Sequence, residues 1–223
     1  MSKIQPFLEK YENNRVIRAL IQLVPYGVGG AIDVVLMKTL ENIKRERAAA
    51  YFDELATGDV VVDEKLLKCE DFLHAYYATT KCALNSRRRE KIRMFARLLK
   101  SSLAESEISD IDKYEDFLKI LDELSYRELL ALKVLDEYSS TPRTEEQNDL
   151  QWTRQFWDEF EQCLADKLSL PKDQVPDFMN RIARTGCYEI FTGMYWGYAG
   201  GQGKLTSTYH KLRKFIEVDN EGS

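Results

Sequence analysis

Apolar residues recur every three or four positions along most of this chain, which is the spacing of one buried face on an α-helix. The clearest run covers residues 31–56, in which charged residues fill the remaining positions. Its apolar stripe comprises Ile32, Val35, Leu36, Leu40 and Ile43. At about 1.5 Å per residue, we expect this helix to be roughly 40 Å long, which is enough to support a whole domain.

A Pro/Gly-rich elbow, VPYGVGG at residues 24–30, precedes this long helix. Pro25 disfavours the helical conformation of the residue before it, and the glycines allow the chain to reverse. The sequence therefore predicts a helical hairpin made of residues 3–24 and 31–56. The elbow lacks the glycine spacing of a nucleotide-binding turn. Because residues 19–37 are largely apolar, a buried core hairpin, which we favour, competes with a hairpin that leaves the bundle and inserts into a membrane.

Further helices are predicted along the middle of the chain, separated by polar segments. Ser125 and Glu128 have the spacing of a capping box, which marks a helix start. The polar residues 139–148 are expected to form a flexible loop. One continuous helix is expected over residues 150–168. Its aromatic side, which is typical of a protein core, comprises Trp152, Phe156, Trp157 and Phe160.

The most basic stretch covers residues 81–100, where eight Lys and Arg stand against Glu90 alone, a local charge of +7. Three arginines at helical spacing share one face of this helix: Arg89, Arg93 and Arg97. This face is a candidate site for phosphate groups or for an acidic membrane surface. The alternative, which we favour, is a solvent-exposed face paired with acidic helices in residues 105–123 and 145–166.

The C-terminal pattern is a helix, a short strand, a glycine-rich turn, a second short strand and a last helix. Together with the helices before it, this order resembles a winged-helix domain, in which a phrase like RIARTGCYEI leads into the wing and a phrase like GKLTSTYHKLRKFI returns from it. Such domains place one helix in the major groove of DNA and the wing on the adjacent backbone. The residues at the corresponding positions are Lys172, Gln174, Asn180, Arg181 and Arg184, with Lys204 on the wing.

Three residues of the same helix, Asp173, Pro176 and Asp177, depart from a DNA-reading surface. Two carboxylates among the cations weaken the attraction to phosphate groups. Because winged helices also serve as protein-docking modules, docking of another protein is at least as good an interpretation of this part of the chain.

Composition narrows the functional classes. The 223 residues carry a formal charge of −5, which argues against a protein dedicated to coating nucleic acid. The four cysteines are scattered, and His74 and His210 are the only histidines, so we expect no catalytic residues, no metal site and no cofactor. The start of the chain is too charged for a signal peptide, and the expected location is therefore the cytoplasm.

The order of segments also resembles uncharacterised bacterial all-α proteins of the abortive-infection alpha type. The segments that carry this resemblance are the apolar helical start, RRREKIRMFARLLKSSL, LSYRELLALKVLDEY and a Gly/Leu-Thr tail. The resemblance implies a role in bacterial conflict or phage resistance, without catalytic residues to carry over.

The expected fold is mostly α, with a helical bundle in residues 1–110 and a winged-helix-like unit with a small β-hairpin in residues 111–223. The expected function is that of a non-enzymatic bacterial interaction or effector protein with a protein partner, whose apolar segment 19–37 is either core or a conditional membrane element. The alternative is a winged-helix regulator that binds DNA. An acidic membrane surface is a further candidate partner, and the sequence does not set the oligomeric state.

Overall fold

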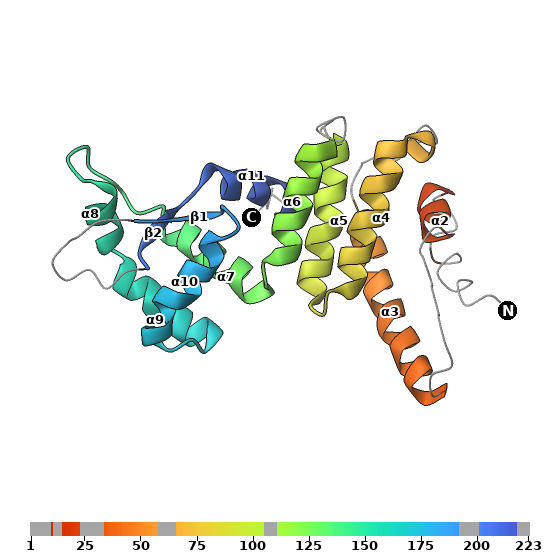
Figure 1. Ribbon diagram of the computed structural model, residues 1–223, viewed down its shortest axis with the longest axis horizontal. Coiled ribbons are helices and arrows are strands. Elements are labelled where there is room, and N and C mark those ends of the chain that lie inside the picture. Colours follow the sequence, from red (N-terminus) through yellow and green to blue (C-terminus); the bar gives the residue numbers. More distant parts are fainter. Residues whose placement is uncertain are drawn as a thin grey trace. The chain divides into compact units, whose positions relative to one another are not determined.

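The structure, a computed structural model, describes residue 10 and residues 15–22, 34–57, 66–104, 111–191 and 201–217. This part of the chain is mostly helical and has a two-stranded antiparallel hairpin near its C-terminal end, as predicted (Figure 1). The elbow lies outside the described residues, so the predicted reversal there stays a prediction. Among the described helices, none is both long enough and apolar enough to cross a bilayer.

The chain divides into two compact units. The first comprises Met1–Leu121 together with Phe215–Ser223, and the second comprises Asp122–Lys214. The first unit thus extends beyond the boundary expected after residue 110 and includes the end of the chain.

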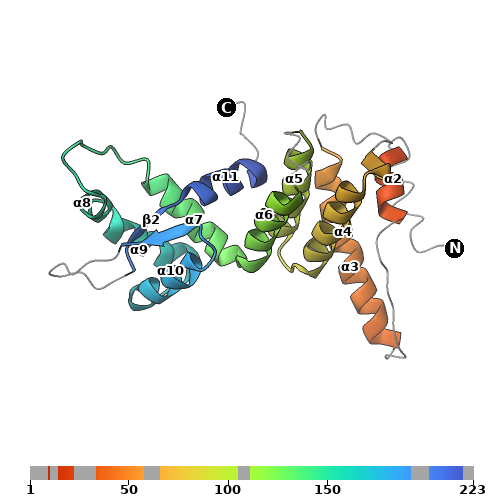
Figure 2. The ribbon, with the colours of Figure 1, turned by 45° about the horizontal axis from the view of Figure 1, so that its top comes forward.

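The first unit is a bundle of helices, which Figures 1 and 2 show from two sides. Its elements are α2 Arg15–Gln22, α3 Val34–Leu55, the 3-10 helix η1 Leu66–Lys68, α4 Glu70–Asn85, α5 Arg89–Ala104 and α6 Ile111–Glu123, whose last residues pass into the second unit. The predicted long helix is present as α3. It packs against both α4 and α5, which form an antiparallel pair joined by a short turn.

The apolar stripe predicted on α5 is part of the core of the first unit, whereas the stripe predicted on α3 is wrong at Ile43, which is 38% exposed. The large apolar side chains that α3 buries are Tyr51, Phe52 and Leu55, about two turns further along the helix. On α5, Ile92, Phe95 and Leu99 recur every three or four residues and are 0% exposed. Burial of each such side chain contributes about 1.5–3 kcal/mol to folding. On α4, Tyr76 Oη donates a hydrogen bond of 2.6 Å to the carbonyl oxygen of Leu20, which attaches α2 to the bundle.

The second unit contains shorter helices and the β-hairpin. Its elements are α7 Tyr126–Tyr138, α8 Asp149–Arg154, α9 Trp157–Leu168, the 3-10 helix η3 Lys172–Gln174, α10 Val175–Ala183, β1 Tyr188–Ile190, β2 Gly203–Leu205 and most of α11 Ser207–Ile216. The strands pair with Tyr188 opposite Leu205 and Ile190 opposite Gly203.

The capping box predicted at the start of α7 is confirmed. Ser125 Oγ accepts a hydrogen bond of 3.2 Å from the backbone amide of Glu128, and Glu128 Oε2 accepts one of 2.7 Å from the amide of Ser125. Two amides that have no partner within the helix are thereby satisfied.

The single helix predicted over residues 150–168 is wrong, because the chain breaks between α8 and α9. The last turn of α8 closes with short-range bonds from the amides of Gln155 and Phe156, and Phe156 leaves the helical conformation with φ −125° and ψ −1°. The helix therefore ends at this point, and a new helical hydrogen-bond series starts at the carbonyl oxygen of Phe156, which accepts from the amide of Phe160. Phe156 and Trp157 are both buried.

The hairpin depends on two glycines. Gly201 has a φ of +82°, and its carbonyl oxygen accepts a hydrogen bond of 2.6 Å from Tyr188 Oη. A Cβ at Gly203 would overlap the carbonyl oxygen of Glu189 and lie 2.6 Å from Cζ of Tyr188. Only glycine therefore lets β2 pass this close to β1.

Candidate functional site

The strongest accumulation of charge lies in the first unit, where α4 turns into α5 and α3 passes beside that turn (Figure 1). Arg47 Nη1 on α3 donates to the carbonyl oxygen of Leu84 at the end of α4, at 2.8 Å. Arg89, the first residue of α5, lies 3.8 Å from a carboxylate oxygen of Glu46 on α3. We call this region the basic end and define it by its charged residues: Lys44, Arg45, Glu46, Arg47, Lys81, Arg87, Arg88, Arg89, Glu90, Lys91 and Arg93.

The basic end differs in sign from the rest of the protein. It holds nine Lys and Arg against two Glu, a local formal charge of +7, whereas the whole chain carries −5 and the remainder therefore −12. A concentration of one sign produces a potential that attracts oppositely charged partners and orients them during approach.

Most of these cations are open to solvent. The exposed ones are Lys44, Arg45, Lys81, Arg87, Arg88, Arg89 and Arg93. In the contact between Arg89 and Glu46, both side chains are 70% exposed. Such an exposed pair contributes at most about 1 kcal/mol. Lys91 is different, since it is buried and its ammonium group lies 5.6 Å from the centre of the Phe95 ring.

The position of three consecutive arginines is locally unfavourable. Arg87 and Arg88 directly precede α5, and Arg89 is its first residue. The amino end of a helix carries a partial positive charge, and a cation there costs about 0.3–1 kcal/mol. The basic end thus combines like charges with a helix dipole of the same sign, an arrangement that costs stability.

The three arginines predicted to form one binding face have different roles. Arg97 Nε lies 2.7 Å from Glu54 Oε1 on α3, and Arg93 Nε lies 3.9 Å from Oε2 of the same carboxylate. The Glu54 side chain is only 11% exposed. Arg97 is therefore largely engaged within the bundle, Arg93 is engaged in part, and Arg89 points to solvent. The observed carboxylate partners lie on α3 and not on the acidic helices that the sequence suggested.

Lys100 completes the attachment of α3 to α5. Its Nζ donates to the carbonyl oxygen of Thr57 at 3.1 Å and to that of Glu54 at 3.4 Å, just at the end of α3. Carbonyl groups at the end of a helix lack partners within it, and a cation there is favourable. Burial lowers the pKa of Lys100, although the charge of Glu54 opposes this effect.

In the second unit, the candidate DNA-reading arginines bind a buried carboxylate. Arg181 Nε and Arg184 Nη1 lie 3.0 and 2.9 Å from Glu128 Oε1, and Glu128 is 2% exposed. Burial alone would raise the pKa of Glu128, but the hydrogen bonds from Arg184, Ser125 and Arg181 outweigh it and lower the pKa to about 2. Arg184 also contacts Glu123 at 2.7 Å.

The remaining candidates on η3 and α10 are exposed: Lys172, Gln174 and Asn180. Asp173 and Asp177 are exposed among them. This surface therefore has two carboxylates between its few cations, and its two arginines already hold acidic partners. It is electrostatically much weaker than the basic end.

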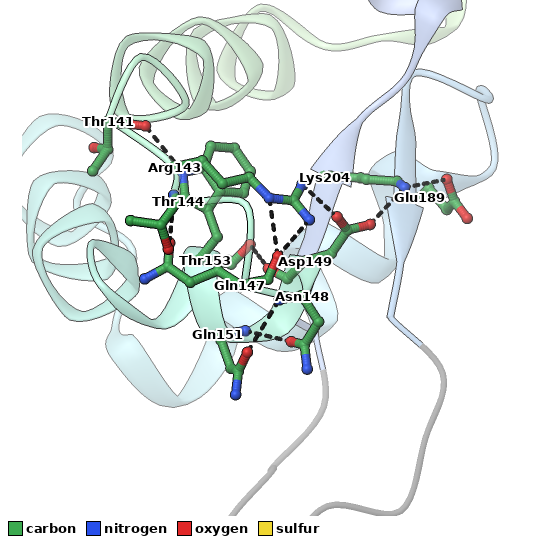
Figure 3. Close-up of polar contacts among 11 residues, drawn as sticks. Thr141, Arg143, Thr144, Gln147, Asn148, Asp149, Gln151, Thr153, Glu189 and Lys204 are labelled. Atoms are coloured by element: carbon green, nitrogen blue, oxygen red, sulfur yellow. Dashed lines mark hydrogen bonds and ion pairs between the residues drawn. The ribbon is translucent and has the colours of Figure 1, made fainter.

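Lys204 belongs to a polar network around the loop before α8 (Figure 3). Its Nζ lies 2.7 Å from Asp149 Oδ2, and Arg143 Nη1 donates to the other oxygen of Asp149 at 2.7 Å. Arg143 Nη2 donates to the carbonyl oxygen of Gln147 at 2.8 Å and closes the loop on itself. The hydrogen bond from Lys204 lowers the pKa of Asp149. Residues 139–148 form a loop, as predicted, and these contacts close it. Its flexibility stays a prediction.

A cavity of about 290 Å³ adjoins this network in the second unit. It is lined by Asp136, Ser139, Ser140, Trp152, Lys204, Leu205 and His210. Its charged groups already have partners, since Asp136 contacts Arg213 and Lys204 contacts Asp149. No unbalanced charge in the described lining therefore selects a class of ligand.

Comparison with known protein families, curated proteins and solved structures found no match for this chain. The resemblances to winged-helix domains and to abortive-infection alpha-type proteins stay predictions. Local sequence reasoning found the α5 part of the basic end and missed the contribution of α3. The run Lys44 to Arg47 was a usable signal, but its position beside α5 depends on packing between distant segments.

Proposed function

We propose that this protein is a non-enzymatic interaction protein that binds a polyanionic partner through the basic end. The observation that carries the proposal is the local charge of +7, presented largely by exposed side chains, in a chain whose net charge is −5. Mutual repulsion among these cations opposes folding, and an anionic partner would relieve it.

The surface formed by α10 and the hairpin is the weaker candidate for this role. Arg181, Arg184 and Lys204 would have to exchange Glu128, Glu123 and Asp149 for an external anion. Removing partners from a buried carboxylate such as Glu128 is costly, because its charge is left uncompensated. The alternative function of a winged-helix DNA regulator therefore has less support than binding at the basic end.

The start of segment 19–37 gives no support to the proposed conditional membrane element. Leu20 and Ile21, near its start, are buried in the first unit. Most of residues 19–37 lies outside the described residues. The burial of Leu20 and Ile21 supports the buried core hairpin that we favoured from the sequence.

Chromatography on a sulfated polysaccharide, a generic polyanion, tests the proposal. The variant Arg87→Ala, Arg88→Ala, Arg89→Ala should elute at clearly lower salt than the native protein. The matched control Lys172→Ala, Lys211→Ala, Lys214→Ala removes the same charge from exposed positions of the second unit. It should elute close to the native protein. Circular dichroism checks that both variants retain their helix content.

Two results would contradict the proposal. The native protein could pass through the column at low salt, or both triple variants could shift equally. The second result would mean that net charge alone, and not the basic end, governs retention.

A further inference from the structure

We infer that the partner of the basic end is a double-stranded nucleic acid, held through its sugar-phosphate backbone without reading of the base sequence. This inference rests on the proposed function and specifies the class of polyanion. Four features of the described part of the first unit support it: the kind of cation, the rigidity and width of the surface, the burial of apolar side chains, and the scarcity of exposed aromatic rings.

The exposed cations are mainly arginines. Five of the seven are arginine, namely Arg45, Arg87, Arg88, Arg89 and Arg93, and two are lysine. The planar guanidinium group can donate two parallel hydrogen bonds to a phosphate, and it is more weakly hydrated than an ammonium group. A surface enriched in arginine is therefore suited to phosphate groups held at fixed positions.

The cations stand on rigid elements. The opposite sides of α3, α4 and α5 are buried, with Phe52, Phe72 and Phe95 at most 1% exposed. Packed helices lie about 8–10 Å apart, so the basic end is roughly 10–20 Å wide. Over that length of its axis, a duplex presents about 6–12 phosphate charges. Seven exposed cations on a fixed support match a regular array of this density.

An acidic membrane is a poorer partner for this surface. A basic helix that lies on a bilayer inserts an exposed apolar face between the lipids. The apolar face of α5 is instead buried in the bundle, with Ile92, Phe95 and Leu99 at 0% exposure. Among the described residues, the exposed large apolar side chains are Ile43 and Tyr77. Within residues 42–57 and 66–103, for which side-chain burial is described, one isoleucine beside the basic end does not form an insertion surface.

Single strands and acidic proteins are also poorer partners. Single-stranded nucleic acid is held largely by stacking of bases on several aromatic rings, and protein interfaces centre on buried aromatic and aliphatic anchors. Tyr77, at 52% exposure, is the one large aromatic side chain exposed to this degree in the described part of the chain. Contacts between guanidinium groups and a duplex backbone need no such rings.

The test is a titration of the full chain with fluorescently labelled 20-base-pair duplexes at several salt concentrations. The probes are two DNA duplexes of unrelated sequence and one RNA duplex. We expect the two DNA duplexes to bind within about threefold of each other, with dissociation constants of about 1–100 μM at physiological salt. A plot of log K against log salt should have a slope of about −4 to −6, since each phosphate contact contributes about −0.9.

The basic-end variant Arg87→Ala, Arg88→Ala, Arg89→Ala should give a salt slope about 2–3 shallower and should bind correspondingly more weakly. The Lys172→Ala, Lys211→Ala, Lys214→Ala control should keep the native slope. If the control loses duplex binding and the basic-end variant keeps it, the inference is overturned and the duplex site lies in the second unit. If the dissociation constants of the two DNA duplexes differ by more than tenfold, the protein reads the base sequence, and that part of the inference is wrong.

Three further probes separate this inference from the proposed function: a single-stranded oligonucleotide, vesicles containing phosphatidylserine, and poly-glutamate. If one of these binds through the basic end and neither DNA nor RNA duplex does, the inference is wrong and the proposed function stands. If no polyanion binds at low salt, both are wrong.

Discussion

Glu128 limits the availability of Arg181 and Arg184 for an external anion, because both arginines bind its carboxylate. From sequence, Arg181 and Arg184 are candidate DNA contacts, and Glu128 is only the second partner of a capping box with Ser125. In the structure, Oε1 of Glu128 accepts hydrogen bonds from both guanidinium groups, and Oε2 accepts one from the backbone amide of Ser125. The capping box was predictable because its two members are three residues apart. The arginine contacts were not, because they join positions more than fifty residues apart in the chain.

The first prediction concerns the pH dependence of Glu128. Its pKa is lowered to about 2 in the folded protein, from an ordinary value of 4.5. Its contribution to stability is therefore fully present above pH 4.5 and is lost as the pH falls from 4.5 toward 2. Glu128→Gln should lower the free energy of unfolding at pH 7 by up to about 3 kcal/mol and flatten its decrease over this range. Urea denaturation from pH 2.5 to 7 measures both effects.

Glu123→Gln is the matched control for Glu128. The Glu123 side chain also contacts Arg184, but it is 50% exposed, so its replacement should change stability by less than about 1 kcal/mol. Equal losses from the two variants would contradict the structural role given to the buried carboxylate.

Among the elements, α3 is joined to α5 by the carboxylate of Glu54, in addition to the hydrogen bonds from Lys100. Glu54→Gln removes the charge that holds Arg97 at 2.7 Å in a setting that is only 11% exposed. We expect a loss of about 1–3 kcal/mol in the free energy of unfolding. Glu46→Gln, on the same helix, removes a partner from the exposed contact with Arg89 and should change stability by less than about 0.5 kcal/mol. Thermal and urea denaturation of the two variants provide the comparison.

A similar comparison is possible between Gly203, the first residue of β2, and Gly186, which lies two residues before β1. In Gly203→Ala, the new methyl group meets the backbone oxygen of Glu189, which cannot move without breaking the pairing of β1 and β2. In Gly186→Ala, nothing lies within 4 Å of the new methyl group, and only the strain of a φ of +72° remains, about 1–2 kcal/mol. Gly203→Ala should therefore lower the melting temperature more than Gly186→Ala. The reverse order would mean that the strands can separate at little cost.

Helices and strands were predictable from the sequence where residues close together in the chain determine them. The existence of α3, α5, α7, the hairpin strands and α11 follows from apolar spacing, a capping box and glycines. The break before α9 was missed because the aromatic residues Trp152, Phe156 and Phe160 fit one helical stripe and no proline or glycine marks the position. It is visible only in the backbone of Phe156, which leaves the helical conformation. The loop before α8 was predicted, but its internal contacts were not, because Arg143 binds a backbone carbonyl that no sequence pattern marks.

For the molecule as a whole, the concentration of positive charge at the basic end predicts that removing its two carboxylates strengthens the binding of duplex DNA. Glu46 and Glu90 are the two carboxylates of the basic end, and both are exposed. Glu46→Gln with Glu90→Gln raises its charge from +7 to +9. We expect tighter binding of duplex DNA at low salt, with a gain that disappears at high salt because exposed charges are then screened. The control Asp173→Asn with Asp177→Asn makes the same change on exposed positions of the second unit and should leave binding nearly unchanged.

The two compact units also predict how the protein unfolds. Each has its own buried core, and the three tryptophans, Trp152, Trp157 and Trp196, all belong to the second unit. Tryptophan fluorescence therefore follows the second unit, whereas far-UV circular dichroism follows the helices of both. Glu128→Gln should shift the fluorescence transition to lower urea. Glu54→Gln should shift part of the circular dichroism transition and leave the fluorescence midpoint in place. If both transitions shift together in both variants, the two units unfold as one cooperative structure and do not have independent stabilities.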